Sequence, residues 1–258
     1  MLQNFLELWR YRTLITALVV RYLSMRYRGS ILGFFWSFLN PLCLMLVYTL
    51  VFKFYMRFDV ENYAIFLFCG LLPWLWVTGG LSEGTSAIVA GGNLITKSMF
   101  PAQILPTVSI LTNMIHFLLA LPLLFVFMLI AGMPIHLTAL ALPLIIFLQF
   151  LILHGAVLFL SALNVKYRDV QHVVGNLLTF LFFLCPIIYP VSQVPERFQI
   201  TLKLNPFAAL TVCYHNLILE GVFPQISTLV CLLVSAIFAL FLGNLVFNRC
   251  REGFAEML

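Results

Sequence analysis

Charged residues are scarce in this sequence. Asp, Glu, Lys and Arg together make up 9% of its 258 residues, whereas hydrophobic residues make up 63%. A soluble domain carries roughly 25% charged residues. Since a protein core cannot hide this much apolar surface from water, the composition excludes an ordinary soluble domain and predicts an integral membrane protein.

Motifs for metal and nucleotide binding are also missing. The five histidines include no pair at the spacing of a zinc-binding helix, and the six cysteines form no CxxC pair. The stretch GGNLITKS (residues 91–98) resembles a P-loop, but Thr96 occupies the position where that loop needs glycine. We therefore expect no metal, no cofactor and no nucleotide site in this chain.

Carboxylates are nearly absent from the apolar runs. The sequence has no nucleophile elbow and no pair of acids on one helical face, and its nine acids stand mostly in connections. Proton-coupled transporters use intramembrane carboxylates. We therefore expect the chain not to be an enzyme, and a transporter of this composition would take its energy from another protein.

Long apolar runs are what the sequence does contain. Six runs have about the 20 residues that a bilayer crossing requires, and they cover residues 30–54, 63–81, 107–132, 137–163, 173–189 and 227–247. This pattern predicts an all-α integral membrane protein with six transmembrane helices.

Lysine and arginine predict the orientation. With the N-terminus inside, ten of these 14 residues lie on the cytoplasmic side and four lie outside. The positive-inside rule therefore places both termini in the cytoplasm. The net charge of +5 follows from this topology and gives no indication of a nucleic-acid partner.

Three segments lie outside the predicted spans. Residues 1–28 have a polar stripe that predicts an amphipathic helix along the cytoplasmic leaflet. The cytoplasmic connection 82–106 and the external connection 190–225 are long enough to carry structure or function of their own. Within the second, residues 210–219 are apolar enough for a short helix that dips into the membrane.

Six stretches of the chain match one known family in order. They are RYRGSILGFFWSFLNPL (26–42), FLFCGLLPWLW (66–76), KSMFPAQILP (97–106), LNVKYRDV (163–170), PIIYPVSQVPE (186–196) and LNPFAAL (204–210). Together they resemble the permease subunit of ABC-2 polysaccharide exporters, the membrane halves of O-antigen, capsule and teichoic-acid transporters. The sequences of these stretches are most similar to those of O-antigen exporters.

The resemblance implies an assembly and a substrate. It implies a homodimer of permeases with two separate ABC subunits that bind ATP and magnesium in the cytoplasm. Each permease would have six spans, an N-terminal interface helix, and short external gate helices before the last span. The substrate would be a polysaccharide on undecaprenyl diphosphate, carried across the inner membrane of a bacterium.

The resemblance also implies roles for residues. Arg26 and Arg28 lie where a lipid diphosphate would enter, although plain anchoring of the topology explains them equally well. Gly29 and Gly33 would allow close approach of a neighbouring helix. An aromatic path between the first and fifth spans would be lined by Phe34, Phe35, Trp36, Phe38, Tyr48, Phe180, Phe183 and Tyr189. Coupling to the ATPase would fall to Thr96, Lys97, Met99, Phe100 and Pro101.

Three other functions remain open from the sequence. A multi-pass enzyme acting on lipid-linked sugars would need acids or a basic cluster at one membrane depth. A channel would need no energy source. An ABC-2 exporter of a small molecule would share the architecture, since an aromatic lining also suits drug-like compounds.

Overall fold

The computed structural model describes residues 2–26, 28–98 and 101–257, and this part of the chain forms helices and no strands. The principal helices are α1 (Leu2–Arg10), α2 (Arg12–Arg26), α3 (Trp36–Thr49), α4 (Tyr63–Ala90), α5 (Gly92–Ser98), α6 (Ile104–Ile130), α7 (Leu142–Lys166), α8 (Val170–Leu184), α9 (Glu196–Leu204), α10 (Pro206–His215), α11 (Ile226–Cys250) and α12 (Phe254–Met257). Short 3₁₀ or π segments extend or join them, and they are η1 (Gly33–Phe35), η2 (Leu50–Tyr55), η3 (Leu137–Ala141), η4 (Val191–Gln193), η5 (Asn216–Glu220) and η6 (Arg251–Gly253).

Five helical segments are long and apolar enough to cross a membrane. They are Gly33–Tyr55, Tyr63–Ala90, Ile104–Ile130, Leu137–Lys166 and Ile226–Gly253. The integral-membrane, all-α prediction is therefore confirmed.

The predicted fifth span, 173–189, is shorter than expected. It corresponds to α8, which has 15 residues and is about 22 Å long at 1.5 Å per residue. A bilayer core is about 30 Å thick. The helix stops because Pro186 follows: the residue before a proline avoids helical geometry, and Cys185 has an extended backbone.

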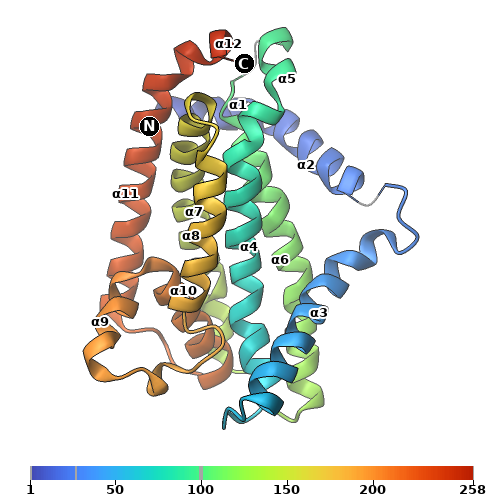
Figure 1. The fold of residues 1–258 in the computed structure, drawn as a ribbon, viewed down its shortest axis with the longest axis vertical. Helices are drawn as coiled ribbons and strands as arrows, with labels where there is room; N and C mark the ends of the chain where they lie inside the picture. Colours follow the sequence, from blue (N-terminus) through green and yellow to red (C-terminus); the bar gives the residue numbers. More distant parts are fainter. Residues whose placement is uncertain (1, 27, 99–100, 258) are drawn as a thin grey trace.

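Helix α4 is the centre of the bundle. It packs against α3, α6, α7, α8 and α10, and its buried residues face every direction. On the other side of α7 lies α11. Gly155 and Gly243 allow these two helices to cross closely, since a Cβ atom at either position would collide with the backbone of the other helix. The long helices stand side by side in Figure 1.

The prediction that the second span ends at Leu81 was wrong. Helix α4 continues to Ala90, so residues 82–90 are helical and only the remainder of the connection 82–106 lies between α4 and α6. The polar residues there remain compatible with a helix because Thr85 and Ser86 donate their hydroxyl hydrogens to backbone carbonyls one turn earlier.

Both ends of the chain lie at one end of the bundle, with α1, α2, α5 and α12 (Figure 1). The predicted amphipathic helix 1–28 is in fact two helices, α1 and α2. Asn4 fixes α1 by donating to Asn244 (2.7 Å) and Asn248 (3.1 Å) of α11. Gln103, just before α6, donates to the carbonyl of Asn4.

Helix α10 returns into the bundle at the opposite end. The Tyr214 hydroxyl donates to Gln149 of α7 (2.9 Å), whose amide donates to the carbonyl of Pro73 in α4 (3.0 Å). All three residues are buried. The short apolar helix predicted for residues 210–219 falls in α10 and η5.

Candidate functional site

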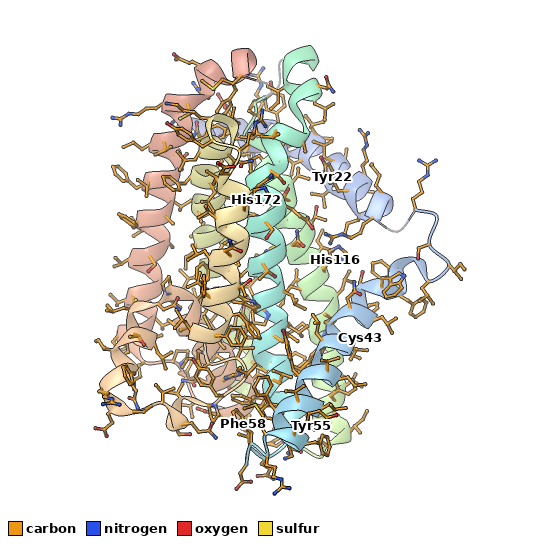
Figure 2. The ribbon with its side chains drawn as sticks, viewed as in Figure 1. Tyr22, Cys43, Tyr55, Phe58, His116 and His172 are labelled. Atoms are coloured by element: carbon orange, nitrogen blue, oxygen red, sulfur yellow. The ribbon has the colours of Figure 1, made fainter. Side chains whose placement is uncertain are left out.

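Helix α3 leans away from the bundle near its start and rejoins it near its end (Figure 1). The space beneath it holds a cavity of about 520 Å³, bounded by the end of α2, α3, α4 and α6. We call it the polar cavity. Figure 2 shows His116 on this flank of the molecule.

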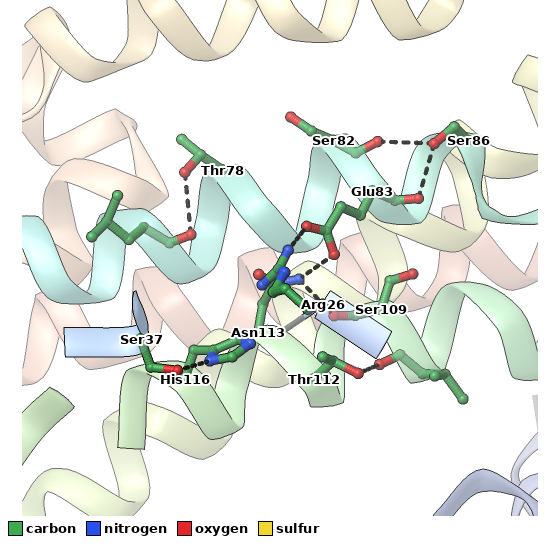
Figure 3. A network of polar contacts seen from close by, with 12 residues as sticks. Arg26, Ser37, Thr78, Ser82, Glu83, Ser86, Ser109, Thr112, Asn113 and His116 are labelled. Carbon is green, nitrogen blue, oxygen red and sulfur yellow. Dashed lines mark hydrogen bonds and ion pairs between the residues drawn. The ribbon is translucent and has the colours of Figure 1, made fainter. Parts of the chain in front are cut away.

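Three residues from three helices form one wall of the polar cavity, and we call them the Glu83 cluster. The Glu83 carboxylate of α4 forms an ion pair with Arg26 at the end of α2 and accepts a hydrogen bond from Asn113 of α6 (2.9 Å). The same Asn113 nitrogen donates to the carbonyl of Ser109 (2.9 Å). Figure 3 shows these contacts converging on one point.

Gly79 makes room for the Glu83 cluster. It lies one helical turn before Glu83, and a Cβ atom at this position would overlap the Asn113 amide. The neighbouring Gly80 has ordinary space around it, with Ile110 at 3.7 Å. Only Gly79 is therefore required by the packing of α4 against the Asn113 side chain.

The opposite wall comes from α3 and the turn before it. The Trp36 indole donates to the Ser30 hydroxyl (3.0 Å), and Ser37 pairs with His116 of α6 (3.2 Å). Asn40 also lines the cavity. Its amide makes no hydrogen bond with any residue that the structure describes.

The deeper part of the polar cavity is apolar. Trp76, with its N–H on the carbonyl of Ile110 (3.1 Å), stacks on Phe117 with ring centroids 5.5 Å apart. Leu72, Leu75 and Ala120 complete this surface. Since Arg26 and Glu83 neutralise each other, the cavity combines hydrogen-bonding groups and aromatic faces with no net charge.

A second cavity of about 460 Å³ lies on the other side of α3, between α3, α4 and α8. We call it the aromatic cavity. Tyr48 and Phe183 both line it, and Tyr48 stacks on Phe182 at 5.5 Å. Tyr189 donates to the carbonyl of Phe183 (2.9 Å).

The other predicted path residues are dispersed. Trp36 lines the polar cavity and not the aromatic one. Phe35 and Phe180 are 71% and 68% exposed and line neither cavity. Phe34 and Phe38 contact each other edge to face at 5.6 Å. The single chain therefore brings two of the eight predicted aromatic residues, Tyr48 and Phe183, into one cavity.

The two predicted phosphate-binding arginines have different surroundings. Arg26 is paired with Glu83. Arg28 is exposed and lines an open cleft of about 820 Å³ with Arg21, Ser24 and Met25. No acid is among the described residues that line this cleft.

The glycine prediction was wrong. Gly29 and Gly33 lie in the turn before α3, with φ angles of +82° and +48°, and nothing approaches their Cβ positions within 4 Å. They provide a left-handed turn that L side chains rarely adopt, and no helix in the described part of this chain packs against them.

The predicted coupling residues are only partly described. Thr96 and Lys97 lie in α5, Met99 and Phe100 lie outside the described residues, and Pro101 is half-buried before α6. Among the residues that the structure describes, no group of three His, Cys, Asp or Glu side chains could hold a metal ion.

Sequence reasoning missed Glu83, Asn113 and His116. One signal was available: Glu83 is the only acid between Glu61 and Asp169. An isolated acid between two apolar runs is costly unless it has a partner. Its partners could not be read from spacing, because Arg26 and Asn113 are 57 and 30 residues away.

Comparison with known proteins agrees with this architecture. Residues 13–219 match the family model described as ABC-2 type transporter. The chain is 39% identical to the O-antigen export system permease protein RfbA of Myxococcus xanthus over 98% of each chain. It is 30% identical to a protein of that name from Klebsiella pneumoniae over 95% of each. It is 24% identical to the polysialic acid transport protein KpsM of Escherichia coli over 92% and 93%.

These matches extend over nearly the whole chain, and the relatives are named as transport proteins and permeases, not as enzymes. With its membrane-spanning helical bundle, the chain belongs to the ABC-2 type transporter family and is a permease.

Proposed function

We propose that this permease exports a polysaccharide linked to undecaprenyl diphosphate, and that the polysaccharide is an O-antigen. The observation that carries the proposal is the aromatic cavity between α3 and α8. The names of the relatives support the polysaccharide class.

The aromatic cavity suits a sliding polymer. Aromatic faces pack against the apolar faces of sugar rings and do not require one fixed linkage. Tyr48 from α3 and Phe183 from α8 supply such faces, with Trp74 of α4 behind them. Thr78 and Ser82 add hydroxyl groups along α4.

A second copy of the chain completes the path in this proposal. Phe35 of η1 and Phe180 of α8 are large aromatic residues that the single chain leaves exposed. A homodimer would cover part of this surface as the contact between the two copies, and the polymer would be enclosed between their two aromatic cavities. Large exposed apolar faces in a membrane protein contact either lipid or protein.

The diphosphate is placed at Arg28. Guanidinium groups pair well with phosphate, and the cleft of Arg21 and Arg28 has no acid among its described lining residues. Arg26 would bind the diphosphate only after release from Glu83, so we assign it a positioning role beside the cleft.

Energy would come from two ABC subunits that bind ATP and magnesium. They would dock at the end of the bundle where α1, α2, α5 and α12 lie (Figure 1), contacting Thr96, Lys97, Met99, Phe100 and Pro101. This end would face the cytoplasm of a bacterium at the inner membrane, a proposal supported by its excess of lysine and arginine.

The proposal is tested by ATP hydrolysis. The chain is purified with its candidate ATPase in lipid nanodiscs, with and without glycan linked to undecaprenyl diphosphate. A stable complex whose hydrolysis rate responds to the glycan supports the proposal. A stable complex whose hydrolysis rate does not respond to the glycan supports the ATP-driven transporter but contradicts the proposed substrate, and a small molecule then becomes the alternative. Failure to form a complex contradicts the proposed ATPase coupling.

A further inference from the structure

The polar cavity has no role in the path proposed above, yet it lies between membrane-spanning helices and contains the carboxylate of Glu83. Asn40 exposes an amide in a spanning helix with no hydrogen-bonding partner among the described residues. Such a group is costly in lipid unless something polar meets it. The cavity is therefore built to hold polar contents.

The charge balance of the cavity argues against phosphate as its contents. The guanidinium of Arg26 is already paired with Glu83. A phosphate placed here would bring its negative charge next to the Glu83 carboxylate, and the two like charges would repel each other. A neutral molecule rich in hydroxyl groups meets no such repulsion.

The hydrogen-bonding groups suit a sugar. Asn40 offers both donors and an acceptor, and the Glu83 carboxylate keeps acceptor positions beyond those used by Arg26 and Asn113. Neighbouring hydroxyl groups of a sugar ring donate and accept in just such pairs. The indole of Trp36, held by Ser30, supplies a flat apolar face. A volume of about 520 Å³ is within the usual range for small-molecule sites.

The position of the polar cavity indicates which sugar of the glycan it would bind. Arg26, the last residue of α2, is at the wall of the polar cavity, and Arg28, in the turn that follows, lines the open cleft described above, which we call the basic cleft. In a lipid-linked glycan the diphosphate is bonded directly to the first sugar. A diphosphate on Arg28 therefore leaves that sugar beside the polar cavity.

We propose that the polar cavity binds the neutral sugar next to the diphosphate, through Asn40, Glu83 and Trp36. This inference rests on the proposed function. It divides substrate recognition between a basic cleft for the phosphates and an uncharged cavity for the first sugar.

The test compares two lipids that differ by that sugar alone. The full chain with its ATPase is placed in nanodiscs, and dissociation constants are measured for undecaprenyl diphosphate and for the same lipid carrying one N-acetylglucosamine. The sugar-bearing lipid should bind about tenfold more tightly, as expected for one or two added hydrogen bonds. Asn40→Leu should reduce this preference to less than about threefold and leave undecaprenyl diphosphate unaffected.

Two control variants, Thr112→Val and Arg28→Ala, and one further test variant, Glu83→Gln, complete the experiment. Thr112 precedes Asn113 in α6, and its hydroxyl donates to the carbonyl of Val108. Thr112→Val should therefore retain the full preference for the sugar-bearing lipid. Arg28→Ala should weaken both lipids by the same factor. Glu83→Gln keeps the shape of the cluster and should lower the preference without lowering the affinity for undecaprenyl diphosphate.

The outcomes separate the two proposals. If the unaltered protein binds both lipids equally, or if Asn40→Leu retains the preference, the sugar site is wrong and the exporter stands. If the unaltered protein binds neither lipid, the proposed function fails and this inference fails with it.

Discussion

The two cavities beside α3 differ in chemistry although they share a wall. Leu75 and Thr78 of α4 line both of them. On one side, side chains from α2, α3, α4 and α6 form a neutral network of hydrogen bonds and one ion pair. On the other, α3, α4 and α8 supply aromatic rings. A network of directed hydrogen bonds holds one ligand in one pose, whereas ring faces tolerate movement.

The contrast matches two tasks in the proposed cycle. A lipid-linked glycan must be recognised once, at its linkage, and then moved repeatedly, one sugar after another. Directed polar groups suit the first task and aromatic faces suit the second. Each prediction below changes one cavity and leaves the other intact, and the matched controls Gly80→Ala and Phe180→Leu change neither.

The largest effect is expected from Gly79→Ala. The added methyl group would overlap the Asn113 amide, so α4 and α6 must separate or Asn113 must leave Glu83. We expect a loss of about 1–3 kcal/mol in the free energy of unfolding, measured by thermal or denaturant unfolding in nanodiscs.

Gly80→Ala is the matched control for that prediction. Its added carbon meets only ordinary contacts, and alanine favours a helix over glycine by up to about 1 kcal/mol. We expect unchanged or slightly increased stability. Equal destabilisation by both variants would contradict the packing role of Gly79.

A moderate effect is expected from Tyr48→Leu in the aromatic cavity. The loss of its ring contact with Phe182 should slow polymer export by about three- to tenfold, the equivalent of 0.5–1.5 kcal/mol. Export is measured as the amount of glycan delivered per unit time at a fixed amount of transporter. The preference between lipids with and without the first sugar should be unchanged.

Phe180→Leu sharpens the same comparison. Phe180 is on α8 but does not line the aromatic cavity, so export should remain within about twofold of the unaltered rate. An effect as large as that of Tyr48→Leu would place the polymer on the exposed face of α8 instead.

The smallest effect on stability is expected from Glu83→Gln. The side chains of Arg26 and Glu83 are 38% and 41% exposed, and ion pairs of this exposure contribute about 0–1 kcal/mol. Unfolding measured at low and high salt should show a change within this range that shrinks as salt rises. A loss above 2 kcal/mol, larger than any exposed pair supplies, would show that the cluster is mainly structural.

The structural features that depend on the length of a run of apolar residues could be predicted from the sequence. The five long spanning segments and the short helix at residues 210–219 follow from runs of apolar residues in one stretch. The short helix α9 and the position of Tyr48 beside α8 were implied by the family resemblance and not by any single run. The polar cavity could not be predicted, because its groups come from Arg26, Glu83 and Asn113, which meet only when α2, α4 and α6 are packed.

Two errors have local causes. The end of the second span was placed at Leu81 because the following residues are polar and rich in glycine. In the structure Gly84 packs against Val157, and Thr85 is bonded to its own helix. The length of α8 was overestimated because apolar residues continue past Pro186, where the chain remains buried but leaves the helix.

The contact between Asn4 and Asn244 joins residues 240 positions apart. It has a consequence for biosynthesis. The first helix is translated at the start, but its partner on α11 emerges from the ribosome only when the chain is nearly complete. The contact of α1 with α11 can therefore form only when synthesis is nearly finished, later than its contact with Gln103 before α6, and it is among the last contacts made during maturation.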